Sequence, residues 1–378
     1  MTIRFPTSHS EPHRKRPFLV LGIETSCDET AAAIVSSDAK IMGQELYSQI
    51  LIHKQYGGVV PEVSARKHLL TLPQAITELF EKSNLTISDI DAIAVTAGPG
   101  LIGGLIVGIS VAKGIALAAG KPCLPINHLM GHALAARLEH EADFPYLLLL
   151  ISGGHCQLVV VSSPLQYSIL GETLDDSVGE AFDKFARMLG LGYPGGAMVE
   201  SLARSGNPLA IDFPKPFYKQ KNCSFSFSGL KTSAKRYIDR HRENMRVEDV
   251  CASFQHAIAL ILADRLMQAI LCITSKSQIM PKSVVVSGGV ASNMYILSTL
   301  RKAAHKYGLG LLHPRSNLCT DNAVMIAWAG IELINENPKH HLNPGTHDLS
   351  FAPKSRWPLN KLMDDYEVLK KRGESRKN

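Results

Sequence analysis

The order of the apolar segments constrains the fold of this chain more than any other feature, because a similar order occurs twice. The first run, from Phe18 to Leu138, is predicted to contain three strands and then alternating helices and strands. The second run begins at Tyr146 with three more strands and continues through helices and a further strand to Glu336. A repeat of this length predicts a duplicated α/β fold.

The individual elements can be read from hydrophobic periodicity and turn residues. In the first run the expected strands are Phe18–Ile23, Ala31–Val35, Ile41–Ser48, Ala92–Thr96 and Cys123–Ile126, and the expected helices are Leu69–Lys82, Leu101–Ala119 and His128–Leu138. In the second run the expected strands are Tyr146–Ser152, Gln157–Ser162, Tyr167–Leu170 and Ser283–Val286, and the expected helices are Glu180–Leu189, Val250–Thr274, Asn293–Tyr307 and Asn322–Glu336. This layout is typical of two ribonuclease-H-like lobes with a nucleotide cleft between them.

These runs define the expected domains. We expect a basic tail over residues 1–17, a first lobe over 18–140, a second lobe over 141–350 and a C-terminal segment with a basic tail over 351–378. Residues 204–246 are rich in Pro, polar and aromatic residues, which predicts an insertion in the second lobe rather than core.

Net charge, apolar stretches and cysteines indicate which classes of protein the sequence fits. The net charge of +6 permits binding to nucleic acid without requiring it. The apolar stretches Leu101–Ala119 and Tyr146–Ile151 are interrupted by Gly or short, so no membrane span is expected. Seven scattered cysteines without a CxxC spacing predict neither a zinc ribbon nor disulfides, and they favour a reducing compartment. We expect the cytoplasm, or a mitochondrial matrix or plastid if the first seventeen residues are a transit segment.

A pair of histidines gives the sharpest local signal. His128 and His132 are four residues apart, so on a helix they share one face and can bind one cation. Asp321 is the best candidate for a third, anionic ligand, and this donor set suits iron(II) or zinc. The alternatives are two structural histidines and a helix N-cap at Asp321. Leu129 occupies the position where a metalloprotease carries its general base.

Three turns of small residues follow predicted strands, and each can bring backbone N–H groups close to a phosphate. They are Glu24–Thr30, Ser152–His155 and Ser287–Asn293. Asp183, the Gly195–Gly196 pair and Glu200 are candidates for binding a ribose and a base, with charges on a helix surface as the alternative. Ser226–Thr232 suits a loop that faces RNA or a nucleotide, unless Phe225 and Phe227 simply anchor it in the core.

Nine motifs occur in order between Phe18 and Leu359, and together they resemble the TsaD family of tRNA N6-adenosine threonylcarbamoyltransferases. The motifs are Gly22–Thr30, Gly57–Glu62, Ala97–Leu101, His128–His132, Ser152–His155, Gly179–Lys184, Ser226–Thr232, Ser287–Asn293 and Cys319–Asn322.

The resemblance implies an actin-like ATPase (ASKHA) fold and a transfer reaction. The threonylcarbamoyl group of threonylcarbamoyl-AMP would move to the N6 amine of the adenosine 3′ of the anticodon, in tRNAs that read codons beginning with A. It implies one divalent metal, iron(II) rather than zinc, bound by His128, His132 and Asp321. The implied substrate-binding residues are Leu150, Ile151, Ser152, Gly153, Gly154, Asp183, Gly196, Glu200 and Asn293.

The details of the motifs point to a branch of the family. Archaeal and eukaryotic cytosolic relatives carry a Tyr ligand where this chain has Leu150, and here His155 follows the turn, so the chain resembles the bacterial or organellar branch. Glu29, or its neighbour Asp28, is a candidate acceptor for the proton of the attacking amine.

The resemblance also implies partners and leaves alternatives open. Bacterial relatives work with a paralogous pseudo-enzyme subunit and a small ATPase, mitochondrial relatives can act without them, and a homodimer is possible through the apolar helix Leu101–Ala119. The competing hypotheses are a zinc metallo-endopeptidase, based on the histidine pair, and a non-enzymatic ATP-binding scaffold. Metal-dependent peptide cleavage would favour the first, and function that survives loss of both histidines would favour the second.

Overall fold

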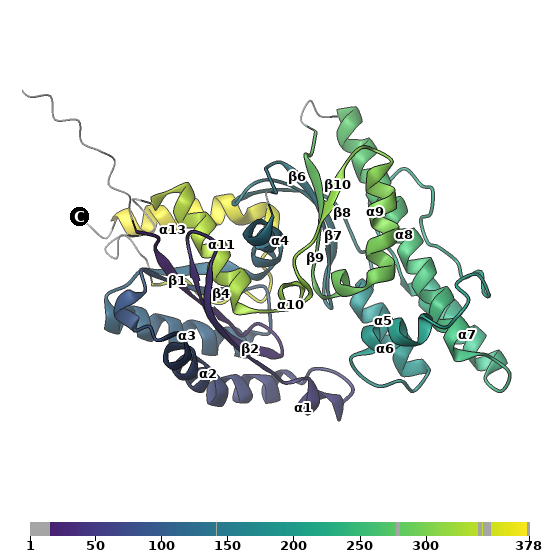
Figure 1. Cartoon of the computed structure of the whole chain (residues 1–378), viewed down its shortest axis with the longest axis horizontal. Coiled ribbons are helices and arrows are strands. Elements are labelled where there is room, and N and C mark those ends of the chain that lie inside the picture. The colour runs from purple at the N-terminus through teal and green to yellow at the C-terminus, as the bar shows by residue number, and fades with distance from the viewer. Residues whose placement is uncertain (1–15, 141, 277–279, 339–341, 343–348, 376–378) are drawn as a thin grey trace, which may run out of the picture.

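The computed structural model describes residues 16–140, 142–276, 280–338, 342 and 349–375. Most of the expected N-terminal tail and the last basic residues of the C-terminal tail, Arg376 and Lys377, lie outside the described residues. Figure 1 shows two sheets in the middle of the molecule, with helices on their outer faces and helix α4 between them.

The first sheet has the strand order β3-β2-β1-β4-β5. β1 pairs antiparallel with β2 and parallel with β4, and β3 and β5 form the two edges. Its strands are β1 (Leu19–Glu24), β2 (Glu29–Ser36), β3 (Ile41–Ser48), β4 (Ala92–Gly98) and β5 (Cys123–Asn127). The central strands are buried almost throughout, which explains their continuous apolar sequences.

The second sheet has the order β10-β9-β6-β7-β8, which is the same order as the first sheet when its strands are counted from β6. Its strands are β6 (Tyr146–Ile151), β7 (Cys156–Ser163), β8 (Gln166–Glu172), β9 (Ser283–Ser287) and β10 (Gly310–Leu312). The duplication predicted from the sequence is therefore confirmed, and among the strands of the described residues the short edge strand β10 was not predicted.

The helices are α1 (Ile50–Lys54), α2 (Pro61–Ser83), α3 (Ile102–Ala119), α4 (His128–Glu139), α5 (Val178–Met188), α6 (Gly195–Ala203), α7 (Ser228–His241), α8 (Val247–Lys276), α9 (Met294–His305), α10 (Ser316–Cys319), α11 (Ala323–Glu336) and α13 (Leu362–Ser375). Two of them, α3 and α8, are long and apolar enough to cross a membrane by length and composition alone. The α8 window is 67% buried, which is typical of a core helix, whereas the α3 window is 33% buried.

Helix α11 packs on the first sheet, against β1, β2 and β4, although the sequence placed it in the second lobe. The contact is close: a Cβ atom on Gly22 of β1 would lie 2.3 Å from the carbonyl oxygen of Ala323. α11 is buried along most of its length, so its apolar surface can cover a sheet that lies far away in the chain. The boundaries 18–140 and 141–350 are therefore wrong for this helix.

The C-terminal segment also belongs to the first lobe. Trp357, Leu359 and Leu362 are buried in the same core as the first sheet, and the backbone N–H of Lys354 donates to the carbonyl of Ala97 at 2.7 Å. The Nδ2 of Asn127 donates to the carbonyl of Trp357 at 2.8 Å, which ties the segment to the start of α4. Helix α13 at its end was not predicted.

The expected insertion at 204–246 contributes core as well as surface. Phe213, Phe225 and Phe227 are buried in the core of the second lobe, and α7 adds Leu230 and Ile238. The prediction that this stretch lies outside the core is therefore wrong, because its aromatic residues cover α5 and α8.

Candidate metal centre and nucleotide cleft

The two histidines lie on the first turns of α4. Asn127 caps this helix: its Oδ1 accepts from the backbone N–H groups of Leu129 at 2.9 Å and Met130 at 3.2 Å. Helix α4 therefore begins at His128 itself, and His132 follows one turn later on the same face. Both side chains are buried, His132 completely.

Asp321 lies in the short connection between α10 and α11, opposite the histidines. It is not the N-cap of α11, because Asn322 has that role and its Oδ1 accepts from the N–H of Met325 at 2.9 Å. The carboxylate of Asp321 is therefore free to face α4. The arrangement depends on α11 crossing to the first sheet, which carries Asp321 to the start of α4.

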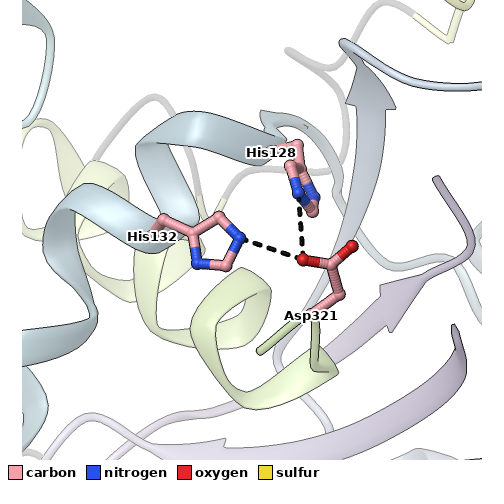
Figure 2. A group of neighbouring side chains, drawn as sticks. All are labelled: His128, His132 and Asp321. Atoms are coloured by element: carbon pink, nitrogen blue, oxygen red, sulfur yellow. Dashed lines mark hydrogen bonds and ion pairs between the residues drawn. The ribbon is translucent and has the colours of Figure 1, made fainter. Parts of the chain in front are cut away.

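Figure 2 shows the three side chains converging. The Oδ1 of Asp321 lies 3.0 Å from His132 Nε2 and 3.4 Å from His128 Nε2, and the three potential ligand atoms lie within 4.8 Å of one another. Two imidazole nitrogens and one carboxylate oxygen at this spacing can bind one divalent cation and leave positions open. The residues present therefore fit a metal.

A buried carboxylate, Glu24 at the end of β1, orients His128. Its Oε2 lies 3.0 Å from His128 Nδ1 and accepts from Thr96 Oγ1 at 2.6 Å, and its Oε1 accepts from the N–H of Ser26 at 2.5 Å. A proton on Nδ1 leaves Nε2 as the atom that can bind a metal, and such a carboxylate–histidine pair is common behind metal ligands. Glu24 was predicted only as part of the turn Glu24–Thr30, although an acid at the carboxyl end of a buried strand was a usable signal for a carboxylate that supports a metal ligand.

The histidines and carboxylates of the metal centre shift one another's pKa values. Burial favours the neutral imidazole of His128, but the carboxylates of Asp321 and Glu24 outweigh burial and raise the pKa of His128 well above its usual value. Burial would raise the pKa of Asp321, but the charge and hydrogen bonds of His128 and His132 hold that pKa well below its usual value. The Nδ1 of His132 has no hydrogen-bond partner within the described part of the chain.

The glycine turns of the second lobe meet at the ends of β6 and β9. A Cβ atom on Gly288 would lie 2.5 Å from the carbonyl oxygen of Ile151, so the two turns lie against each other. A Cβ atom on Gly153 or Gly154 would meet nothing within 4 Å, which leaves their backbone open to a ligand. Ser152 holds this turn, since its N–H donates to the carbonyl of His155 at 2.8 Å.

Leu150 and Ile151 differ from the rest of the predicted substrate set. Both side chains are completely buried, Leu150 in the core shared with the first sheet and Ile151 in the core of the second lobe. Any contact of these two residues with a ligand would therefore be made by their backbone groups, so their place in the substrate-binding set stays a prediction.

The remaining predicted substrate residues surround α6. The Oδ1 of Asp183 accepts from the N–H of Gly195 at 2.7 Å, next to Gly196 at the start of that helix. The Oε1 of Glu200 accepts from the N–H of Met294 at 3.0 Å, and the Nδ2 of Asn293 donates to Gln255 Oε1 at 2.7 Å. A cavity of about 450 Å³ opens here, and its lining includes Glu200, Arg204, Gln255, Met294 and Tyr295.

Two further groups near the centre have perturbed pKa values. Burial and the charge of Asp28 raise the pKa of Glu29 to about 10, so at neutral pH this carboxyl holds a proton. Burial and the nearby charges of His128 and His132 lower the pKa of His155 to about 4. Glu29 accepts from Ser48 Oγ at 3.2 Å.

The loop predicted to face RNA is instead occupied by internal contacts. The Oδ2 of Asp175 accepts from Ser226 at 2.5 Å and from Ser228 at 2.6 Å, and Lys231 forms an ion pair with Asp176. Phe225 and Phe227 are completely buried, as the alternative interpretation held.

Comparison with solved structures shows the fold. HypF from T. kodakarensis matches with a TM-score of 0.56 at 16% identity, over 86% of this chain and 50% of that one. A full-length HypF in a phosphate- and nucleotide-bound form matches with a TM-score of 0.54 at 13% identity, over 85% of this chain and 47% of that one. These similarities fit the duplicated, two-lobed actin-like fold described above.

Comparison with known sequences shows the family. Residues 40–328 match the family model of TsaD, described as tRNA N6-adenosine threonylcarbamoyltransferase. Proteins of that name are 47% identical in Paramagnetospirillum magneticum, covering 90% of this chain and 97% of the relative, and 48% identical in Wolbachia pipientis wMel, covering 90% and 98%. The relative in Rhizobium johnstonii is 47% identical and covers 94% and 99%. The resemblance seen in the motifs is thus confirmed, and the chain belongs to the TsaD family of tRNA N6-adenosine threonylcarbamoyltransferases.

Proposed function

We propose that this chain transfers the threonylcarbamoyl group of threonylcarbamoyl-AMP to the N6 amine of the adenosine 3′ of the anticodon, in tRNAs that read codons beginning with A. The observation that carries the proposal is the meeting of His128, His132 and Asp321 in a member of this family. The endopeptidase alternative has no support, because Leu129 is buried where a general base would stand. The scaffold alternative has none either.

We infer that His128, His132 and Asp321 hold one divalent cation, and that iron(II) suits this set better than zinc because two imidazoles and one carboxylate with open positions are typical of iron(II) sites. A bound cation would act as a Lewis acid toward oxygens of the transferred group. Glu24 would keep the Nε2 of His128 directed at the ion.

The cleft supplies positions for both ends of the donor. The backbone N–H groups at Gly153 and Gly154 would bind its phosphate, since the space beside them is open. The cavity beside α6 would take the adenosine, with Glu200 and Gln255 in its lining. Asp183 would position the start of α6, and Asn293 would position Gln255. The transferred group would then lie between this phosphate site and the histidines of α4.

The transfer releases AMP and one proton. The N6 nitrogen forms a bond to the carbamoyl carbon, the bond from that carbon to the phosphate oxygen breaks, AMP leaves, and the amine loses one proton. We propose that the neighbouring carboxyls of Asp28 and Glu29 take up this proton as a pair, because Glu29 already holds one at neutral pH and cannot act alone. An adenine amine is a weak nucleophile, so holding it near the carbamoyl carbon supplies much of the rate.

Partners and compartment follow from the surface and the cysteines. Leu70 on α2 and Ile102, Ile106 and Leu117 on α3 are between 49% and 74% exposed, and we propose that this apolar face binds the pseudo-enzyme subunit or a second copy of the chain. None of the seven cysteines, all of which the structure describes, is in a disulfide, and we propose the cytoplasm or an organelle matrix on this ground.

The test is an in vitro assay with synthetic threonylcarbamoyl-AMP and unmodified tRNA, followed by nucleoside analysis and elemental analysis of the protein. His132→Ala should lower the transfer rate at least roughly 100-fold by removing a ligand. His305→Ala, an exposed histidine on α9, serves as the matched control and should keep the wild-type rate. Unchanged tRNA together with metal-dependent peptide cleavage would restore the endopeptidase hypothesis.

A further inference from the structure

The largest excess of positive charge inside the two lobes lies in one segment. Residues 213–246 contain nine Lys and Arg against two acidic residues, a net charge of +7, whereas the whole chain carries +6. The rest of the chain therefore has a net charge of −1, with its remaining basic clusters in the two tails. The basic residues of the segment are Lys215, Lys219, Lys221, Lys231, Lys235, Arg236, Arg240, Arg242 and Arg246.

Most of these cations lack an acidic partner. Lys215, Lys231 and Arg246 form ion pairs with Asp212, Asp176 and Asp249, respectively. Over the parts of the chain that the structure describes, the remaining six take part in no ion pair, and all six are exposed. Exposed cations that are not neutralised by the protein are available to a partner. The six are Lys219, Lys221, Lys235, Arg236, Arg240 and Arg242.

Helix α7 presents part of this charge on a single outward face. It buries Leu230, Ala234 and Ile238, which follow one another at intervals of four residues. Lys235, Arg236 and Arg240 therefore lie on the opposite, exposed side. Because the apolar side of α7 is used in the protein core, the helix has no apolar face left to insert into a lipid surface.

The segment is held rigidly by buried contacts. Arg265 is completely buried and donates to the carbonyls of Phe217, Gln220 and Asn222 at 2.6 to 2.9 Å, which fixes the loop that carries Lys219 and Lys221. Asp175 accepts from the N–H of Phe227 at 2.8 Å and from the hydroxyls beside it, which fixes the start of α7. A preformed surface loses little conformational entropy when it binds.

We propose that the exposed face of α7, together with Lys219 and Lys221, is the surface on which the phosphate backbone of the tRNA docks. The inference rests on the proposed function and adds the contact surface to it. Closely spaced cations bind closely spaced phosphates regardless of base sequence, so this surface positions the RNA while the cleft selects the base. Figure 1 shows α7 at the outer end of the second lobe, beyond α5 and α6.

The test compares two triple variants of the full chain. The first is Lys235→Gln, Arg236→Gln and Arg240→Gln on α7. The matched control is Arg301→Gln, Lys302→Gln and Lys306→Gln, at or just after the end of α9, which removes the same charge from exposed cations that have no ion pair within the described residues. The dissociation constant for unmodified tRNA is measured from about 50 to 200 mM salt, and the transfer kinetics are measured beside it.

The α7 variant should bind tRNA roughly 10- to 100-fold more weakly near 0.1 M salt, and its plot of log affinity against log salt should be shallower by about three. Its KM for tRNA should rise while kcat at saturating tRNA stays near the wild-type value, and the α9 variant should behave as wild type. Equal affinities in all three proteins, or equal losses in both variants, would overturn the inference. So would a variant that keeps its tRNA affinity but loses binding to phosphatidylglycerol vesicles. A wild-type protein that neither binds nor modifies tRNA would instead refute the proposed function.

Discussion

Replacing Glu24 by Gln tests whether this carboxylate positions the metal ligand His128. Both oxygens of Glu24 accept hydrogen bonds: Oε1 from the N–H of Ser26, and Oε2 from Thr96, with His128 Nδ1 at 3.0 Å. A Gln amide can accept with only one of its two terminal atoms. If the amide nitrogen replaces Oε1, it faces the N–H of Ser26; if it replaces Oε2, it faces Nδ1 of His128 and favours a proton on Nε2, which blocks the metal.

Either orientation should weaken metal binding. Substitutions behind metal ligands typically cost 10- to 100-fold in affinity, so we expect a loss of roughly 1.4 to 2.7 kcal/mol. Asp321 and Glu24 stabilise a proton on His128, and a cation must displace that proton. The metal affinity of the wild-type protein should therefore fall as the pH is lowered, and the metal affinity of the variant should fall less steeply.

The assay is competition for Zn²⁺ against a chelator of known affinity, on metal-free protein at several pH values. Glu62→Gln is the matched control because it makes the same chemical change on the surface. Glu62 forms an exposed ion pair with Arg66 on α2. It should leave Zn²⁺ affinity unchanged and alter stability by less than about 0.5 kcal/mol. A folded Glu24→Gln protein with wild-type Zn²⁺ affinity would refute the reasoning.

Three further predictions concern stability. Arg265→Met should lower the free energy of unfolding by about 3 to 5 kcal/mol in urea titrations, because Asp264 and three carbonyls lose their buried partner; a loss below about 1 kcal/mol would show that the loop is held by other contacts. Gly22→Ala should destabilise the first lobe by about 1 to 3 kcal/mol because its Cβ would collide with Ala323, whereas Gly114→Ala on α3, with open space around its Cβ, should be neutral or stabilising in the same thermal melts. Glu29→Gln should stabilise metal-free protein increasingly from pH 6 to 9, with melting temperature as the measurement. The folded chain keeps a proton on Glu29 up to about pH 10, whereas the unfolded chain loses it near pH 4.5, so Glu29 lowers stability as the pH rises. A difference in melting temperature between the two proteins that does not grow with pH would contradict this.

Much of the fold could be predicted from local patterns alone. β3 was predicted at its observed bounds, and the ends of α3 and α4 were predicted to within about one residue, because apolar periodicity and capping residues act over a few neighbouring positions. The elements that were not predicted are β10 and the helices α1, α6, α7, α10 and α13. β10, α1, α6 and α10 are short, and α7 and α13 are rich in polar residues, so their periodicity is weak. The assignment of 204–246 as insertion was wrong because its buried aromatic residues are scattered among Pro and Lys.

The metal centre likewise has one part that local sequence predicts and one part that depends on tertiary packing. The shared helix face of His128 and His132 could be predicted from their spacing alone, since side chains four residues apart face the same way on any α-helix. The acids that contact them depend on long-range packing: Asp321 is 189 residues from His132, and Glu24 is 104 residues from His128. Asp321 reaches the histidines because α11 packs on the first sheet, which places the connection between α10 and α11 beside α4. Such packing depends on the shape and burial of whole elements rather than on any short stretch of residues.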